Sequence, residues 1–277
     1  MNKNILLIVE GARAESWFFK RVDDLIKDKL GTGFEICSFN TNIYTLYEKI
    51  KSDDEFLNVK DVLIEMHEDY RKLLKDKEFL YIYLIFDLDP HHPRKSEKRI
   101  DKKVINNNMK IILEMAKHFD NETEPTKGKL YINYPMMESF KDCNSSTFFD
   151  NSYKDEIIEN LSSNVKKFKQ YIGRKKISNY HINRLTFDNI ENLIVQNIFK
   201  LNLLINNKWE MIQKYKDYEN DANCITILNA QKKLIDEDKL FILNTSLFLI
   251  VDYFGSKKEN NFYPNLVNKA HVVSKIN

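Results

Sequence analysis

The feature that most constrains the fold of this chain is an eight-residue apolar run, Phe79 to Phe86, which stops at Asp87. A continuous apolar run of this length is typical of a strand that is buried on both faces, as strands of parallel sheets are. The aliphatic run from Asn4 to Val9 has the same character. We therefore expect both runs to be buried strands, and we predict two further strands at Phe34 to Phe39 and Lys129 to Asn133.

Segments with helical periodicity separate these strands. Apolar residues recur at helical spacing within Ala14 to Lys29, and further helices are predicted over Tyr44 to Lys51, within a charged stretch between Asp53 and Lys77, and from Ser96 to about His118. Strands that alternate with helices favour βαβ units and a mostly parallel sheet that is covered on both faces. The first half of the chain is thus predicted to be an α/β domain.

The second half of the chain has a different pattern. From about Asp150 onwards helical stripes continue without a convincing strand, for example at Ile190 to Leu201 and Leu240 to Tyr253. We therefore predict a domain boundary near residue 145, with a sheet domain at 1–145 and an all-helical domain at 146–277.

Composition narrows the class of protein. The chain has 277 residues, of which 43% are hydrophobic, which is enough for a full core and too apolar for a disordered chain. Its longest apolar stretch, Leu240 to Val251, is interrupted by polar residues and is shorter than the ~20 residues of a membrane span. The run Ile5 to Val9 is too short for a signal peptide, and Cys37, Cys143 and Cys224 form no zinc or disulfide pattern. We expect a soluble, cytoplasmic protein.

The net charge of +2 conceals a difference between the two halves. Residues 1–150 contain 24 Lys and Arg against 27 Asp and Glu, a balance of −3, whereas residues 151–277 contain 19 against 14, a balance of +5. An acidic first half and a basic second half suit a metal site beside a phosphate-binding surface. A general bias toward Lys, Asn and Ile, such as a low-GC genome produces, is the alternative source of these lysines.

Three carboxylates follow the predicted strands. Glu10 follows the first strand, and Asp87 and Asp89 follow the longest apolar run. Ligands of open parallel sheets bind at the carboxyl ends of the strands, and the two aspartates point the same way because side chains alternate along an extended segment. Mg²⁺ binds one or two carboxylates together with waters and phosphate oxygens, so the three residues are candidate metal ligands. Asp-x-Asp is also common in turns, and Glu15 can either support the metal or favour a helix N-terminus.

The segments Ile5–Gly11 (ILLIVEG) and Ile85–Asp89 (IFDLD) resemble the two signature motifs of the Toprim domain. Topoisomerases, bacterial primases, and the RloB-like and overcoming-lysogenization-defect defence nucleases share this Rossmann-like domain. The resemblance covers about the first 140 residues. It implies that Glu10 is a general acid or base or a metal ligand, and that Asp87 and Asp89 bind Mg²⁺, for which Mn²⁺ can substitute.

The nuclease branch of the Toprim family fits the chain best. A topoisomerase needs a further domain with a nucleophilic tyrosine, and a primase needs zinc-binding and polymerase domains, which 277 residues do not supply. The segment Tyr134–Phe140 (YPMMESF) is similar in position to the Asn-Pro-x-x-Glu segment of RloB-like proteins, with Asn133 displaced by one residue. Glu138 is accordingly a further candidate metal ligand, and the alternative is a solvated glutamate that opens a helix.

The resemblance also implies a biological setting. It points to a Mg²⁺-dependent endonuclease of prokaryotic anti-phage defence, which can be the toxic partner of a separate ATPase sensor. The substrate would be nucleic acid, either DNA or RNA, tRNA included, and no membrane is involved.

Basic residues follow the acidic pair directly. Arg94, Lys95 and Lys98 lie where the phosphodiester backbone of a substrate needs neutralising, and we predict that they bind nucleic acid. A solvated helix face is the alternative interpretation. A second basic group with interleaved aromatic residues, Lys166 to Lys176, is open to the same two interpretations.

Two other functions compete with the nuclease. Haloacid-dehalogenase-like phosphatases also have a strand that ends in Asp-x-Asp, but here Pro90 and His91 follow where that motif continues with small residues, and Glu10 is left unexplained. The second alternative is a non-catalytic module with a Toprim fold that binds a protein partner.

The six glycines form no phosphate-binding loop, and no serine-hydrolase motif is present.

Overall fold

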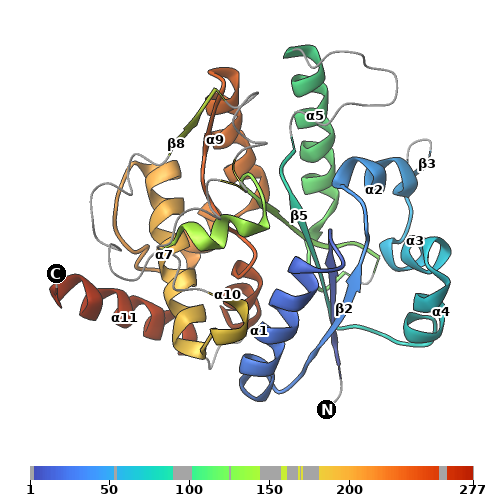
Figure 1. Ribbon diagram of the computed structural model, residues 1–277, viewed down its shortest axis with the longest axis horizontal. Helices are drawn as coiled ribbons and strands as arrows, with labels where there is room; N and C mark the ends of the chain where they lie inside the picture. The colour runs from blue at the N-terminus through green and yellow to red at the C-terminus, as the bar shows by residue number, and fades with distance from the viewer. Residues whose placement is uncertain are drawn as a thin grey trace. The chain divides into compact units, whose positions relative to one another are not determined.

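The chain forms two compact units in the computed structural model, Met1–Tyr131 and Ile132–Asn277 (Figure 1). The structure describes residues 3–52, 55–89, 102–124, 126–143, 157–160, 168, 170, 181–255 and 261–276. Each unit has its own set of buried apolar side chains.

A five-stranded sheet forms the centre of the first unit, and one of its strands runs past Tyr131 to Asn133. The order of its strands is β2 (Phe34–Ser38), β1 (Ile5–Val9), β5 (Tyr81–Asp87), β7 (Gly128–Asn133) and β6 (Asp120–Asn121). Strand β1 pairs in parallel with β2 and β5, whereas the short β6 is antiparallel to β7. The predicted α/β fold with a mostly parallel sheet is therefore confirmed, and each predicted strand lies within two residues of the observed one.

The two longest apolar runs are the most deeply buried strands. All five residues of β1 and the five residues 82–86 of β5 are buried. Both strands have neighbours on each side, and their residues face apolar side chains on both faces of the sheet, so neither face tolerates a polar residue. The uninterrupted apolar sequence of each run follows from this position.

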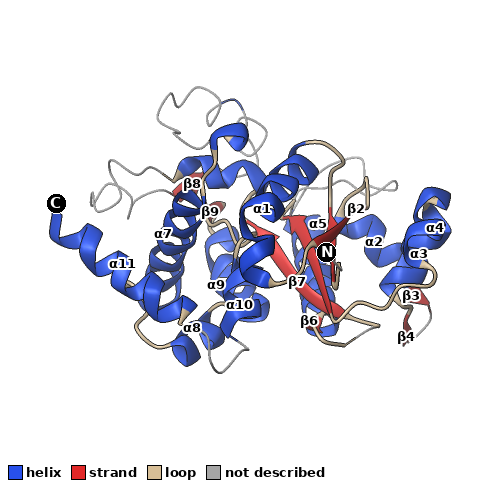
Figure 2. Ribbon diagram, turned by 90° about the horizontal axis from the view of Figure 1, so that it is seen from below, coloured by secondary structure: helices blue, strands red, loops and turns tan. Residues whose placement is uncertain are grey.

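Helices flank the sheet. In chain order they are α1 (Ala14–Leu30), α2 (Ile43–Ile50), α3 (Val59–Met66), α4 (Glu68–Leu74) and α5 (Lys102–His118). In Figures 1 and 2, α1 lies on one side of β1 and β2, and α2, α3 and α4 lie on the other. Two short antiparallel strands, β3 (Lys51–Ser52) and β4 (Glu55–Phe56), precede α3.

Local signals set the ends of these helices. Gly31 ends α1 in the left-handed conformation (φ 72°), and the side chain of Asn42 accepts two backbone N–H groups of the first turn of α2. The single helical stripe predicted between residues 53 and 77 forms two helices, because the backbone of His67 is extended between them. The predicted start of α5 at Ser96 lies outside the described residues.

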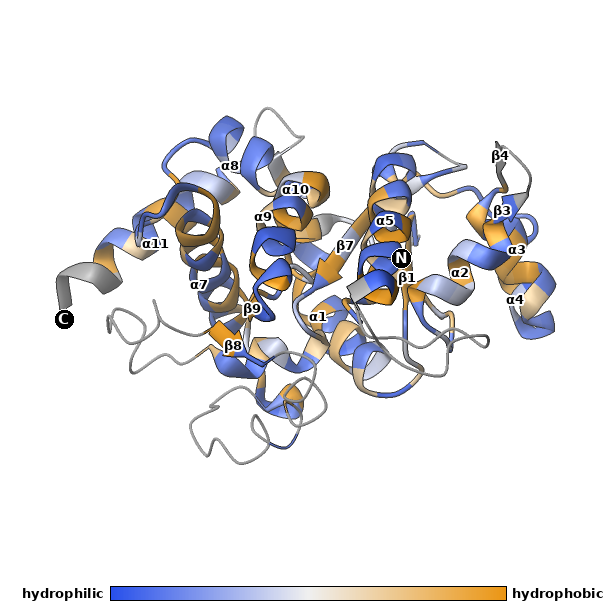
Figure 3. Cartoon of the chain, turned by 90° about the horizontal axis from the view of Figure 1, so that it is seen from above, coloured by the Kyte–Doolittle hydropathy of each residue, from blue (hydrophilic) through white to orange (hydrophobic). Residues whose placement is uncertain are grey.

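The second unit consists mostly of helices. They are the 3-10 helices η1 (Met137–Asp142) and η3 (Ile182–Arg184), and α7 (Phe187–Asn206), α8 (Tyr215–Asp221), α9 (Cys224–Asp236), α10 (Phe248–Gly255) and α11 (Phe262–Ile276). Helix α10 is buried from Phe248 to Phe254, and Figure 3 shows mostly hydrophobic residues along it. Strands β8 (Ile157–Glu159) and β9 (Lys239–Phe241) pair antiparallel, so the prediction that the second half contains no strand was wrong.

The helix predicted from Leu240 to Tyr253 begins only at Phe248. The side chain of Gln231 holds the preceding backbone extended, because its Nε2 donates to the carbonyl of Phe241 (2.8 Å) and its Oε1 accepts the N–H of the same residue (3.1 Å). A short buried strand has no visible alternation, so its sequence alone does not distinguish it from a buried helix.

Buried polar side chains join η1, α7 and the segment that follows β9. Lys200 Nζ donates to Asp142 Oδ2 (2.9 Å), and the two side chains are 1% and 0% exposed. The N–H of Asn244 donates to Asn197 Oδ1 (2.8 Å), and Asn244 Nδ2 donates to the carbonyl of Met137 (2.9 Å). These bonds fix three segments that are distant in sequence around one polar core.

The segment 132–143 belongs to the second unit because of similar bonds. Thr245 Oγ1 donates to the carbonyl of Ile132 (2.9 Å), and Tyr134 and Leu243 exchange two backbone hydrogen bonds (2.8 and 3.0 Å). The boundary that we predicted near residue 145 comes after this segment, because the sequence does not reveal pairings between residues so far apart.

Removing one partner of the Lys200–Asp142 pair is expected to destabilise the second unit strongly. Lys200→Ala leaves the Asp142 carboxylate buried without this cation, and breaking a buried pair costs about 3–5 kcal/mol. The double variant Lys200→Met, Asp142→Leu should lose less, because it removes both charges and keeps the volume. The measurement is urea unfolding followed by circular dichroism, with Lys216→Ala at the exposed Lys216–Glu219 pair as control. A free energy of unfolding of Lys200→Ala within about 1 kcal/mol of wild type would contradict this prediction.

Candidate functional site

The candidate site lies at the carboxyl ends of β1 and β5. The two strands are parallel neighbours in a register that places Val9 beside Ile85, so both end at the same edge of the sheet. The N–H of Glu10 donates to the carbonyl of Ile85 (3.2 Å), which extends the pairing by one residue. In this register Glu10 lies beside Phe86, and Glu10 and Asp87 leave neighbouring strands at the same edge of the sheet, as the sequence predicts.

A direct hydrogen bond connects these two acidic residues. The backbone N–H of Asp87 donates to Oε2 of Glu10 at 3.0 Å, and both residues are half-buried. The bond turns the Glu10 carboxylate toward the end of β5. Because an ionised carboxylate has acceptor capacity for several partners, Glu10 can accept this bond and also contact a metal or a proton.

Asp89 lies two residues further along, and a tyrosine from α2 anchors its backbone. Tyr44 Oη donates to the carbonyl of Asp89 at 2.6 Å. Leu88 is only 1% exposed, whereas Asp87 and Asp89 are half-buried, which is the alternation expected of an extended segment. The side chain of Leu88 thus anchors the segment on one side and leaves the aspartates on the other.

The turn after β1 brings a further carboxylate close. A Cβ atom on Gly11 would lie 2.5 Å from Oε2 of Glu15, so the Glu15 carboxylate lies over this glycine. Ser16 Oγ donates to the carbonyl of Gly11 (3.3 Å) and lies 2.8 Å from Ser38 Oγ. The first turn of α1 is therefore fixed to the turn that carries Glu10, and Glu15 faces the backbone of this turn.

Polar residues that the sequence did not reveal complete this edge. Tyr70 Oη accepts the N–H of Ser38 (2.8 Å) and donates to its carbonyl (3.2 Å), and burial raises the pKa of this phenol. His67 Nε2 lies 3.2 Å from the carbonyl of Phe39. Asn40, in the left-handed conformation (φ 62°), donates its N–H to the carbonyl of Glu10 (2.8 Å). No motif predicts these contacts, because they join separate helices to the ends of β1 and β2.

The residues predicted to bind a metal lie at this edge of the sheet. Mg²⁺ typically binds one or two carboxylates and keeps several waters, and the hydrogen bond between Glu10 and Asp87 brings two carboxyl-bearing residues together. Among the described residues, which include Glu10, Asp87 and Asp89, no group of three or more His, Cys, Asp or Glu residues could hold a metal ion, so the three predicted ligands do not come together as one group. Metal binding at this edge therefore stays a prediction.

The remaining predicted site residues are Glu138, Arg94, Lys95 and Lys98. Glu138 is in the first turn of η1, in the second unit, and is half-buried, with Oε2 shielded from solvent. It does begin a short helix, but it is not fully solvated. Its role as a metal ligand stays a prediction. Arg94, Lys95 and Lys98, like nearly all of the second basic group, lie outside the described residues.

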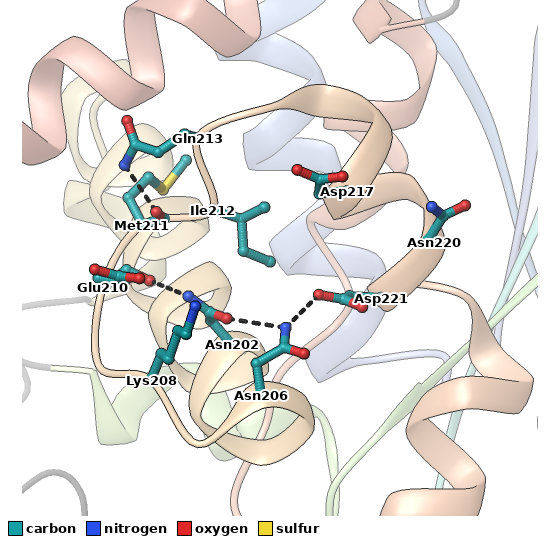
Figure 4. A pocket seen from close by; sticks show the side chains of 10 residues that line it. All are labelled: Asn202, Asn206, Lys208, Glu210, Met211, Ile212, Gln213, Asp217, Asn220 and Asp221. Atoms are coloured by element: carbon teal, nitrogen blue, oxygen red, sulfur yellow. Dashed lines mark hydrogen bonds between the residues drawn. The ribbon is translucent and has the colours of Figure 1, made fainter.

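A separate polar pocket is present in the second unit. It has a volume of about 390 Å³, and Figure 4 shows carboxylates of Glu210, Asp217 and Asp221 among the groups that line it. Asn206 Nδ2 donates to Asp221 Oδ2 (2.7 Å) and to Asn202 Oδ1 (3.0 Å). None of the predicted site residues lines this pocket.

No protein-family model matches the chain, and no similar protein was found among curated proteins or among solved structures. In the part of the chain that the structure describes, no helix is long and apolar enough to cross a membrane.

The hydrogen bond from Tyr44 to Asp89 is expected to stabilise the candidate site. Tyr44→Phe should lower the free energy of unfolding by about 1 kcal/mol, because the partly buried carbonyl of Asp89 loses this donor. Tyr47→Phe, on the same helix, is the matched control, since its hydroxyl contacts the exposed Glu114 (2.8 Å) and should matter less. Urea unfolding of both variants provides the comparison. Equal stability of the two variants would show that the Tyr44 hydroxyl does not anchor Asp89.

Proposed function

We propose that the chain is a Mg²⁺-dependent endonuclease of the Toprim type that cleaves phosphodiester bonds in nucleic acid. The observation that carries the proposal is the contact of Glu10 with Asp87 at the carboxyl ends of two parallel strands, where Asp87 N–H lies 3.0 Å from Glu10 Oε2. Both residues belong to the segments that resemble the Toprim motifs. The half-buried carboxylates keep access to solvent, which a substrate phosphate requires.

Each carboxylate has a role in this proposal. Asp87 and Asp89 hold the cation, and Leu88 and Tyr44 fix the backbone between them. Mg²⁺, when bound, polarises the scissile phosphate and lowers the pKa of a bound water. Glu10 takes up or returns a proton at one carboxylate oxygen while the other accepts the N–H of Asp87, or it holds a second ion.

The proposal includes the substrate and the setting that the resemblance implies. Arg94, Lys95 and Lys98 would neutralise the phosphodiester backbone beside the acidic pair. The enzyme would act in prokaryotic anti-phage defence, as the toxic effector controlled by a separate ATPase. Either DNA or RNA would meet the chemistry of the site, because the phosphodiester is common to both.

Neutral variants of the two carboxylates test the proposal. Glu10→Gln and Asp87→Asn keep the side-chain volume, and Glu10→Gln also keeps an oxygen that can accept the N–H of Asp87. Each should lower Mg²⁺-dependent cleavage of plasmid DNA or tRNA about a hundredfold or more, since proton transfer and metal binding both need the charge. Cleavage is measured on gels with Mg²⁺, with Mn²⁺ and with EDTA.

Asp76→Asn is the matched control, because it removes an exposed carboxylate in the loop before β5. It should cleave like wild type. Cleavage by Glu10→Gln and Asp87→Asn at the wild-type rate, or activity that persists in EDTA, would refute the proposed nuclease.

A further inference from the structure

The first turns of α1 expose a large aromatic side chain close to the candidate site. Trp17 is 64% exposed, more than any other large hydrophobic residue in the described part of the chain. Folding favours burial of a tryptophan, because its ring removes a large apolar area from water. An exposed indole offers a flat aromatic face to a ligand.

Basic side chains share this face of α1. Arg13 and Lys20 are exposed and lie four residues before and three residues after Trp17, so the three occupy adjacent turns on one face of the helix. The opposite face is buried in the first unit through Phe18 and Phe19. We call the surface that these three residues form, Arg13, Trp17 and Lys20, the α1 face.

The α1 face is confined to the end of the helix that adjoins Glu10. The contact of Ser16 Oγ with the carbonyl of Gly11 (3.3 Å) fixes this end to the turn after β1. Further along α1 the exposed positions carry both signs of charge, namely Asp24, Asp28 and Lys29, and Asp24 pairs with Lys27 (3.4 Å). The exposed tryptophan with an exposed basic residue on either side of it lies in the first turns of the helix.

We infer that the α1 face binds a single-stranded segment of nucleic acid. The indole of Trp17 stacks on a base, and Arg13 and Lys20 contact the flanking phosphates. A single strand is required because bases in a duplex are stacked on each other and cannot offer their faces to a surface indole. The inference rests on the proposed nuclease, and it names the substrate class of that site: an unpaired strand that passes over the first turns of α1 toward Glu10.

Intrinsic fluorescence gives a direct test of the stacking. The chain has two tryptophans, Trp17 and Trp209, and the second is half-buried. In Trp209→Phe, Trp17 is the sole emitter, and binding of short oligothymidylate or oligouridylate should quench it. The titration is made in EDTA with the full chain, so that binding is measured without cleavage. If Trp209→Phe is unstable, the same oligonucleotide is titrated into wild type and into Trp17→Phe. Quenching that occurs in wild type and is absent in Trp17→Phe is then due to Trp17.

Substitutions test each part of the α1 face through fluorescence anisotropy of labelled oligonucleotides. Trp17→Ala should weaken binding of the single strand about tenfold, and Trp17→Phe should restore part of it. Arg13→Ala and Lys20→Ala should each reduce the salt dependence of binding by roughly one phosphate contact. Leu80→Ala and Lys117→Ala are the matched controls, because they remove an equally exposed apolar residue and an exposed lysine from elsewhere in the first unit.

The two oligonucleotides and a blunt duplex separate the outcomes. Quenching of Trp17 by either single strand supports the inference, and the tighter of the two identifies DNA or RNA as the better substrate. Absence of quenching, or an equal loss of single-strand and duplex affinity in Trp17→Ala, overturns it. Cleavage that depends on Glu10 without quenching of Trp17 would leave the nuclease standing and refute the α1 face. Quenching of Trp17 without cleavage that depends on Glu10 would support the α1 face and refute the nuclease.

Discussion

The parallel pairing of β1 with β5 is the interaction on which the candidate site depends. Their register places Val9 beside Ile85 and allows the N–H of Asp87 to reach Glu10 Oε2. A slip by one residue would turn every side chain of the slipped strand to the opposite face of the sheet. The packing of the two apolar runs against their neighbours therefore also positions the carboxylates that follow them.

The two units achieve a defined structure by different means. The first unit relies on apolar strands, in which hydrophobic burial is the dominant favourable contribution. The second unit buries the Lys200–Asp142 ion pair and the amide of Asn244 as well as apolar side chains. Buried polar groups are costly when they lose their partners, so such a network tolerates few alternative arrangements of η1, α7 and the segment after β9.

This difference explains which features of the structure could be predicted from the sequence. In the first unit, β5 and the Glu10–Asp87 contact could be predicted, because an apolar run and the polar residue that ends it are local features. The break at His67 and the anchoring of Asp89 by Tyr44 could not, since they depend on the partners that folding brings together. In the second unit, β9 was missed for the same reason: Gln231, which fixes its backbone, has no signature in sequence.

Folding alone does not account for the group of residues at the carboxyl edge of the sheet. Glu10 and Asp87 lie at the ends of neighbouring strands, where like charges repel. The sheet would form equally well with neutral residues at these positions. Trp17 leaves an apolar ring in water on a helix whose other face is fully packed. The carboxylates lie at the ends of β1 and β5, and the exposed indole lies in the first turns of the helix that follows β1. One ligand with phosphates and unpaired bases would contact both.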